Sequence, residues 1–297
     1  MSQVTTLLLA ALTVLALWYV WRWFAIERSR TTPLRWPDAG DIVIGLVTNF
    51  FDTLGVGSFA PTTALFKFRG RIRDEDIPGT LNVGHALPTL VQALIFIAVV
   101  NVDWLTLLGM IAAAVLGAWL GVGVVARLPR RAIQLGMGIA LLFAAVLFLA
   151  KNLDWMPGGG DTLGLDGARL AFAVIVSFVL GALMMLGVGL YAPCLILVSL
   201  LGMNPLAAFP IMMGSCAFLM PVGGARFVRA GRYDVRSALG LALGGIPGVL
   251  LAAFVVKSLP IAAIRWLVLV VVIYTAMQML LSAARKVALA QPGDAAP

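Results

Sequence analysis

Long apolar runs separated by short polar segments fill most of the chain. The apolar runs lie at about 7–23, 80–100, 105–126, 132–150, 206–225, 237–256 and 262–283. Each run is close to the roughly 20 residues that an α-helix needs to cross a bilayer. Because a helix satisfies its own backbone hydrogen bonds in lipid and an open sheet does not, the pattern predicts an all-α integral membrane protein.

Composition agrees with a membrane protein. Of the 297 residues, 62% are hydrophobic and 11% are charged, and the mean hydropathy is +1.03. A soluble domain is about half apolar and about a quarter charged. A soluble fold of this size has too little interior to bury so much apolar surface, whereas lipid would cover it.

Two blocks of the sequence occur twice. Residues 54–61, LGVGSFAP, match residues 186–193, LGVGLYAP, at an offset of 132, with six of the eight residues identical. Downstream of each block, six more residues recur, here at an offset of 131. They are Asp103, Leu108, Gly109, Gly117, Leu128 and Pro129, which match Asp234, Leu239, Gly240, Gly248, Leu259 and Pro260. Two matching blocks in the same order indicate a duplicated unit.

The duplication divides the chain into five parts. We expect residues 1–40 to form an N-terminal transmembrane helix with a cytoplasmic linker, and residues 41–150 to form the first membrane repeat. An extracytoplasmic linker (151–167), the second membrane repeat (168–284) and a cytoplasmic tail (285–297) follow. Each repeat is predicted to hold a broken helical hairpin, with LGVGxxAP as the break, and then three transmembrane helices.

The basic residues predict the orientation. If each broken hairpin returns to the side from which it entered, one side of the membrane carries 17 of the 21 Lys and Arg residues. These lie in five groups, at 22–35, 67–73, 127–131, 226–236 and 285–286. Because cytoplasmic loops are rich in Lys and Arg, we expect the N-terminus outside and the C-terminus in the cytoplasm. Each repeat then makes an odd number of net crossings, which predicts two inverted copies.

The LGVGxxAP sequences are the predicted substrate site. Gly permits backbone angles that other residues avoid and Pro lacks a backbone N–H, so each sequence should break its helix. Free N–H groups at the start of the next half-helix attract anions. The candidate substrate-binding residues are Gly55, Gly57, Pro61, Thr62, Gly187, Gly189, Pro193, Cys194 and Ser215. The alternative at each break is a packing kink that binds no ligand.

Asp52 and His85 are the candidates for coupling transport to protons. Asp52 lies two residues before the first LGVG block, and its counterpart in the second copy is Met184. An acid inside a membrane is costly and so suggests a function. His85 is the only histidine, has Ser215 as its counterpart, and titrates near neutral pH. For Asp52 the alternatives are a carboxylate near the membrane interface and one that accepts hydrogen bonds from the broken backbone. For His85 the alternative is a hydrogen bond between two helices.

Other reactive side chains are few. The two cysteines, Cys194 and Cys216, lie in apolar segments without a CxxC or Cys/His cluster. A plain buried cysteine is the alternative for Cys194, and a hydroxyl that bonds back to its own helix is the alternative for Thr62. The sequence holds no recognisable catalytic set, so we expect no enzymatic activity, no cofactor and no metal.

Small residues recur at every fourth position in two predicted crossings. They are Gly109, Ala113, Gly117 and Gly121 in the first copy, and Gly240, Gly244 and Gly248 in the second. Such ladders let helices pack closely in lipid, so they predict packing surfaces and not ligand sites.

With these motifs the chain resembles the TauE/SafE sulfite-exporter family of membrane permeases. The resemblance rests on the glycine-rich breaks and on a small-residue crossing that begins after a short Asp-containing loop and ends in Leu-Pro. In this chain those elements are Gly55, Gly57, Pro61, Asp103, Gly117, Leu128 and Pro129, with Gly187, Gly189, Pro193, Asp234, Gly248, Leu259 and Pro260 in the second half. The resemblance covers residues 41–284 and implies transport of small, often sulfur-containing anions such as sulfite or organosulfonates.

These observations together predict a secondary transporter in the bacterial cytoplasmic membrane. It would move small, sulfur-containing anions, with protons as the expected coupling ion, and its partners would be the anion and membrane lipid. The net charge of +8 lies in short clusters between apolar runs, so it predicts orientation and not nucleic-acid binding. The alternatives are an uncoupled anion channel or facilitator, and a membrane assembly subunit that transports nothing.

Overall fold

The computed structural model describes residues 3–30, 36–155 and 160–255, with single residues between 270 and 284. Apart from one isolated bridge between Thr162 and Met203, the regular elements in these ranges are helices. They are α1 (Gln3–Arg28), α2 (Ala39–Thr53), α3 (Phe59–Arg69), η1 (Asp74–Asp76), α4 (Ile77–Gly84), α5 (Ala86–Val99), α6 (Trp104–Val125), α7 (Arg130–Asn152), α8 (Gly167–Met184), α9 (Tyr191–Leu200), η2 (Pro205–Ala207), α10 (Ala208–Ala230) and α11 (Val235–Val255).

Length and composition show which helices could span a membrane. Within the described ranges, seven helical spans are long and apolar enough to cross a membrane. The prediction of an all-α integral membrane protein is therefore confirmed. The last predicted crossing, at about 262–283, lies outside the described residues except for single positions from 270 onward, and the tail at 285–297 lies outside them entirely.

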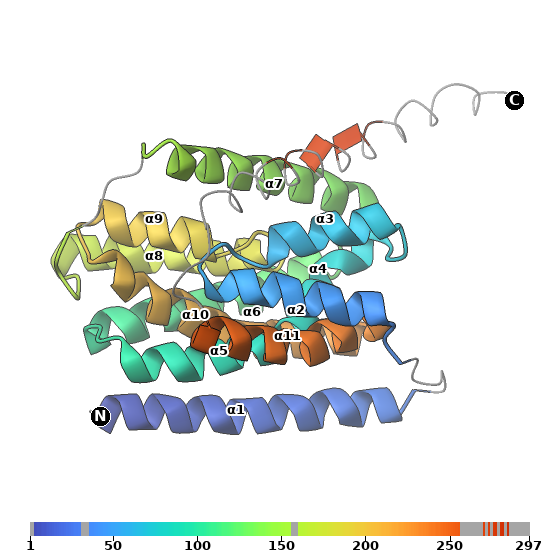
Figure 1. Cartoon of the computed structure of the whole chain (residues 1–297), viewed down its shortest axis with the longest axis horizontal. Helices are drawn as coiled ribbons and strands as arrows, with labels where there is room; N and C mark the ends of the chain where they lie inside the picture. The colour runs from blue at the N-terminus through green and yellow to red at the C-terminus, as the bar shows by residue number, and fades with distance from the viewer. Residues whose placement is uncertain are drawn as a thin grey trace, which may run out of the picture.

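The loops gather at two opposite ends of the bundle (Figure 1). At the arginine-rich end, made of the loops 69–76, 126–130 and 228–236, the Arg232 Nη1 group donates to the Ala126 carbonyl at 2.8 Å. At the linker end, made of residues 100–103, 160–166 and 201–204, the Asn204 N–H donates to the Thr162 carbonyl at 2.8 Å. The helices run between these two ends.

Each broken segment returns to the end at which it begins. Helix α3 ends beside the start of α2, where Arg69 pairs with the N-cap residue Asp38 at 2.9 Å. Helix α9 ends beside the start of α8. The hydrogen bond from the Thr162 hydroxyl, in the loop before α8, to the carbonyl of Gly202 after α9 shows this, at 2.9 Å. The first hairpin lies at the arginine-rich end and the second at the linker end. That placement agrees with inverted copies, and the inversion itself stays a prediction.

The two breaks begin with the same backbone hydrogen bonds and differ at the second glycine, where Gly57 has a φ of 90° and Gly189 has no positive φ. In the first, the N–H groups of Leu54, Gly55 and Val56 donate to carbonyls of Phe51 and Asp52. The second break repeats all three bonds at an offset of 132, with Leu186, Gly187 and Val188 as donors. Gly55 and Gly187 both take positive φ, at 81° and 99°, which only glycine adopts at little cost. The repeated sequence therefore produces a repeated fold.

The repeats pack against each other through their small-residue ladders. Helix α2 of the first copy packs mainly on α11 of the second, and α8 of the second packs mainly on α6 of the first. A Cβ added to Gly121 would lie 2.8 Å from the Ala182 carbonyl oxygen, and one added to Gly45 would lie 2.7 Å from the Gly240 carbonyl oxygen. The backbones of paired helices thus lie in direct contact, which confirms that the ladders are packing surfaces.

The crossing predicted at 80–100 is divided into α4 and α5 at His85. Pro88 explains the division, because it has no N–H to donate to the carbonyl of Gly84 and its ring crowds that carbonyl. The N–H groups of His85 and Thr89 still bond four residues back, at 3.0 Å each, so the two pieces continue in one direction. The matching crossing of the second copy, α10, is one continuous helix.

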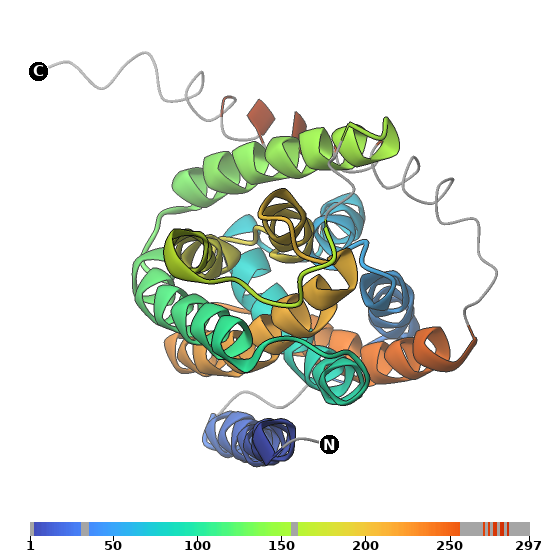
Figure 2. The same cartoon turned by 90° about the vertical axis from the view of Figure 1, so that its left-hand side faces the viewer.

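Helix α1 lies on the outside of the bundle, on the side opposite α7 (Figures 1 and 2). The Tyr19 hydroxyl donates to the carbonyl of Val83 at 3.2 Å, and Trp23 Nε1 donates to the Tyr233 hydroxyl at 2.9 Å. The rest of its surface is largely exposed apolar side chain, which suits contact with lipid.

Candidate functional site

Both breaks open onto one small pocket inside the bundle. Its wall is formed by residues 56–60 of the first copy and 188–193 of the second, with further side chains from α2, α5, α7, α8 and α10. The cavity volume is about 40 Å³. One water molecule needs about 10–15 Å³ by this measure, so the pocket has room for about three waters or one small ion.

Two helices begin at the wall of this pocket. Thr62 is the first residue of α3 whose N–H bonds within the helix, and Cys194 holds the same place in α9. The N–H groups of the residues before them have no helical partner. Four of these residues, Phe59, Ala60, Tyr191 and Ala192, line the pocket. Two positive helix ends therefore meet there, one from each copy.

A buried carboxylate is held at the same wall by a chain of hydrogen bonds. The Gln92 Nε2 group donates to Asp52 Oδ2 at 2.9 Å and to the Thr53 hydroxyl at 3.0 Å. The Tyr191 hydroxyl donates to Gln92 Oε1 at 2.5 Å, and Ser58 faces the Asp52 carboxylate through its hydroxyl and its backbone. The chain joins α2 and α9, the hairpin helices of the two copies, through α5.

The rest of the wall is apolar and rich in sulfur. Cys216 on α10 donates to the thioether of Met184 at 3.5 Å, and Met220 lies one turn after Cys216. All three side chains are buried. No Lys, Arg or His lines the pocket in the described part of the chain, so its hydrogen-bond donors are backbone N–H groups, hydroxyls and the Cys216 thiol. No three His, Cys, Asp or Glu side chains of the described residues gather closely enough to hold a metal ion.

His85 lies in a separate buried network. The Asn49 Nδ2 group donates to the Gly45 carbonyl at 2.8 Å, which directs Asn49 Oδ1 toward His85 Nδ1 at 3.0 Å. Nδ1 must then carry the proton, and Nε2 accepts from the Thr62 hydroxyl at 3.0 Å. Both ring nitrogens are therefore used in joining α2, α3 and the α4–α5 junction.

The predicted site residues divide into three groups. Four of them, Asp52, Gly57, Gly189 and Pro193, line the pocket together. Gly55 and Gly187 turn the backbone of the breaks from behind the wall. The others lie off the wall: Pro61, Thr62, His85, Cys194 and Ser215.

Several residues of the site do not appear among the sequence-based candidates, and three of them make polar contacts there: Gln92, Tyr191 and Cys216. Gln92 is a polar side chain in the middle of an apolar crossing, which is a signal in itself. Tyr191 is one of the variable positions within the second LGVGxxAP block. Cys216 lines the pocket in place of its neighbour Ser215, because one residue along a helix turns the side chain by about 100°. Only Gln92 could have been found from the sequence.

The chain matches the family model described as Sulfite exporter TauE/SafE over residues 1–148 and 169–296. The matched range includes α1, which the resemblance seen in the sequence left out. The chain has no significant match among curated proteins or among solved structures. Because the family model covers nearly the whole chain, including both copies and both breaks, this multi-pass membrane protein belongs to the sulfite exporter TauE/SafE family of transporters.

Proposed function

We propose that the protein is a proton-coupled transporter of a small, sulfur-containing oxyanion such as sulfite, and that the anion binds in the pocket between the two breaks. One observation carries the proposal: two helix N-termini and one buried carboxylate share the wall of a single small pocket. The family supports the sulfur oxyanion, since its name describes a sulfite exporter.

The pocket suits a small anion in both size and chemistry. Free N–H groups at a helix start bind anions, and the pocket receives such groups from both α3 and α9. A volume of about 40 Å³ suits an ion of a few atoms. The thioethers and aromatic rings of the wall exclude water from the ion, which strengthens its interaction with these dipoles.

Asp52 provides the expected link to protons. An ionised carboxylate about 4 Å from a bound anion would repel it by roughly 4 kcal/mol at an effective dielectric constant near 20. A repulsion of that size lowers the affinity for the anion about a thousandfold. A proton on Asp52 neutralises the carboxylate and removes the repulsion. The anion and the proton would therefore bind together, each favouring the other to the same extent. His85 is a poor second candidate, because hydrogen bonds occupy both its ring nitrogens.

Transport would move one repeat against the other around the pocket, as in other transporters with broken helices. We place the protein in the bacterial cytoplasmic membrane with the arginine-rich end in the cytoplasm. The loops of that end contain Arg69, Arg71, Arg73, Arg127, Arg130, Arg232 and Arg236. Cysteine accessibility tests this orientation at Asp161, an exposed linker residue, because both native cysteines are buried. Labelling of Asp161→Cys from the cytoplasmic side would contradict it.

Flux into proteoliposomes tests the transport proposal. Purified protein would be tested with sulfite, thiosulfate, sulfate and a short sulfonate, with and without an imposed pH gradient. The key variant is Asp52→Asn, which keeps the size of the side chain and cannot ionise. The matched control is Asp166→Asn, because Asp166 is an exposed carboxylate outside the pocket wall.

We expect wild-type protein and Asp166→Asn to move sulfite faster when the pH gradient drives it. Asp52→Asn should lose that response. Flux that follows the anion gradient and ignores both pH and Asp52 would instead indicate an uncoupled facilitator. Absence of flux for all four anions, from protein that remains folded, would reject the oxyanion proposal.

A further inference from the structure

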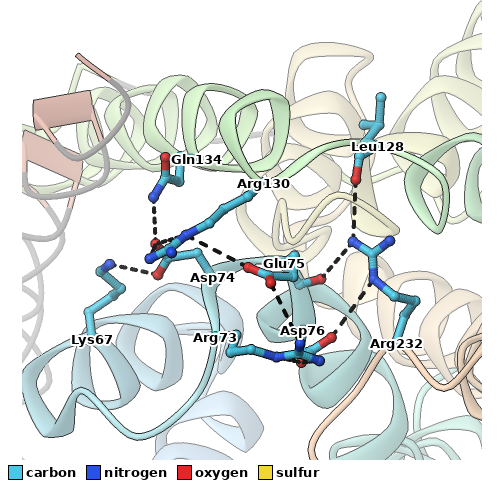
Figure 3. A network of polar contacts seen from close by, with 9 residues as sticks. All are labelled: Lys67, Arg73, Asp74, Glu75, Asp76, Leu128, Arg130, Gln134 and Arg232. Carbon is cyan, nitrogen blue, oxygen red and sulfur yellow. Dashed lines mark hydrogen bonds and ion pairs between the residues drawn. The ribbon is translucent and has the colours of Figure 1, made fainter. Parts of the chain in front are cut away.

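Three arginines from three separate segments surround a second cavity, at the arginine-rich end (Figure 3). The cavity volume is about 290 Å³. Its wall consists of Arg73, Glu75, Leu128, Pro129, Arg130 and Arg232. It shares no residue with the pocket between the breaks. Arg73 precedes η1, Arg130 begins α7 and Arg232 precedes α11, so both copies contribute to this cavity.

Two of the arginines keep donors available. Arg73 donates through Nε to Asp76 at 2.8 Å, and its Nη2 lies 2.6 Å from the same oxygen. Its Nη1 is 3.9 Å from Glu75, beyond hydrogen-bond distance. Arg130 donates to Asp74 through Nη2 at 3.2 Å and Nε at 3.4 Å. In both side chains Nη1 has no hydrogen bond to a described residue.

Two buried polar atoms at this cavity also lack hydrogen bonds. Arg232 donates through Nη1 and Nη2 to backbone carbonyls, but its buried Nε makes no hydrogen bond. This Nε lies 3.8 Å from Asp76 Oδ1, an atom behind the cavity wall that is also buried without a hydrogen bond. Glu75 Oε2 is buried without a hydrogen bond and lies 3.7 Å from Arg130 Nε. Because buried polar groups in native proteins are nearly always bonded, both atoms point to a partner in the cavity.

Charge favours an anion as that partner. Asp74 is already saturated, because it accepts from Lys67 at 2.6 Å, from Gln134 at 2.6 Å and from Arg130. Four cations, Lys67, Arg73, Arg130 and Arg232, face three carboxylates, those of Asp74, Glu75 and Asp76 (Figure 3). Two further arginines, Arg127 and Arg131, are exposed on the same turn. The cavity therefore has more positive charge than its acids neutralise.

We propose that this cavity binds a phosphate-type oxyanion. The flat fork of a guanidinium matches the oxygen pairs of phosphate, and two free Nη1 groups with the buried Arg232 Nε would serve as donors. A protonated or hydrated phosphate oxygen would serve Glu75 Oε2. The oxyanion can come from an anionic lipid headgroup, since basic pockets at the cytoplasmic side of membrane helices bind such headgroups. A free oxyanion offers the same chemistry.

A thermal-shift titration tests the proposal and distinguishes the two sources. Delipidated protein in an uncharged detergent would be titrated in one series with inorganic phosphate and in another with phosphatidylglycerol. The reference lipid is phosphatidylcholine, which is zwitterionic and has no net charge. A ligand that binds only the folded protein raises its unfolding temperature. The variants are Arg73→Gln and Arg130→Gln. The matched control is Arg229→Gln, which removes an exposed arginine at the same end but outside the cavity wall.

We expect wild-type protein and Arg229→Gln to bind with the same affinity, and each cavity variant to bind roughly tenfold more weakly. A response to phosphatidylglycerol alone identifies the headgroup, and a response to inorganic phosphate identifies a soluble ion. The proposal fails if neither ligand shifts the unfolding temperature, or if the cavity variants respond as the control does.

A second variant guards against loss of folding. Arg73→Lys keeps the charge and loses the planar fork, and its side chain is 69% exposed in the wild type, so the fold should tolerate it. Its affinity should fall between those of wild type and Arg73→Gln, and an affinity equal to wild type would reject the role of the fork. Because the readout is binding, a negative transport assay would leave this proposal unaffected.

Discussion

The contact between α6 and α8 gives the most direct test of how the repeats pack. Gly117 on α6 lies against the backbone of α8. A Cβ added there would overlap the carbonyl group of Phe178, 2.8 Å from its carbon, and would lie 3.1 Å from the nitrogen of Ala182. We therefore predict that Gly117→Ala destabilises the protein. Gly109, two turns earlier on the same helix, is the matched control, because its added Cβ would meet only a Val174 methyl at 3.4 Å.

The size of the effect follows from these distances. An ordinary contact lies at about 3.4 Å, so the helices must move apart by about 0.6 Å to relieve the carbon contact alone. A gap of that size forfeits a quarter to a half of the dispersion energy along the seam. Overpacking of this kind costs about 1–3 kcal/mol. Both substitutions gain the same helix propensity, up to about 1 kcal/mol, so that gain cancels in the comparison.

We expect Gly117→Ala to be about 2 kcal/mol less stable than Gly109→Ala. The measurement is unfolding of the purified protein with increasing SDS in mixed micelles, followed by circular dichroism. If the two variants differ by less than about 0.5 kcal/mol, the helices do not touch at Gly117 and the packing described here is wrong. A larger loss from Gly109→Ala would place the seam elsewhere on α6.

Three further predictions concern single polar groups. Tyr191→Phe removes the donor to Gln92 Oε1 and should lower the free energy of unfolding by about 1–3 kcal/mol. A double-mutant cycle with Gln92→Leu, measured by SDS unfolding, tests this. Additive effects would show that the two side chains do not interact. Thr62→Val removes the donor to His85 Nε2 and should lower the free energy of unfolding by a similar amount. Sulfite flux per folded molecule should keep its response to a pH gradient. Loss of that response would make His85 a coupling residue again. The Asp41 backbone N–H and the guanidinium groups of Arg71 and Arg69 hold the pKa of Asp38 below its ordinary 3.8, so the stability from this cap is complete above about pH 4 and is lost as the pH falls below that. The thermal midpoint of Asp38→Asn should therefore fall less than that of wild type between about pH 6 and pH 3, and equal falls would contradict this account of the cap.

The backbone of the site could be predicted from the sequence, because its signal is local. The glycines of LGVGxxAP require positive φ at Gly55 and Gly187, and the same three hydrogen bonds close both breaks. The repeat of that signal at a constant offset indicated that the second break would copy the first. The close helix packing at the ladders that contain Gly117 and Gly244 could also be predicted, since a spacing of four places small residues on one helix face.

The side-chain partners could not be predicted, because they are distant in sequence. Gln92 bonds to Asp52 across 40 residues and to Tyr191 across 99. His85 offers no local sign that Asn49 and Thr62 would occupy both its ring nitrogens. One hairpin helix also differs from the expected length. The sequence predicts a short apolar piece before the second break, but α8 has 18 residues against 15 for α2, so by length and composition it could itself span a membrane.

The two copies share the backbone hydrogen bonds of their breaks and differ in the side chains that matter for the proposed function. Asp52 is matched by Met184, and both line the same pocket. A second acid at that position would put two carboxylates beside one small anion, and each ionised carboxylate would weaken binding by roughly 4 kcal/mol at an effective dielectric constant near 20. A single acid lets one proton neutralise the wall, while the repeated backbone still supplies N–H donors from both sides. The copies also differ at the two ends of the molecule. The short helix η1 of the first copy consists of Asp74, Glu75 and Asp76, whereas η2 of the second copy consists of Pro205, Leu206 and Ala207. Duplication thus explains the shape of the pocket, and the loss of symmetry in its side chains explains how one proton and one anion could be bound together.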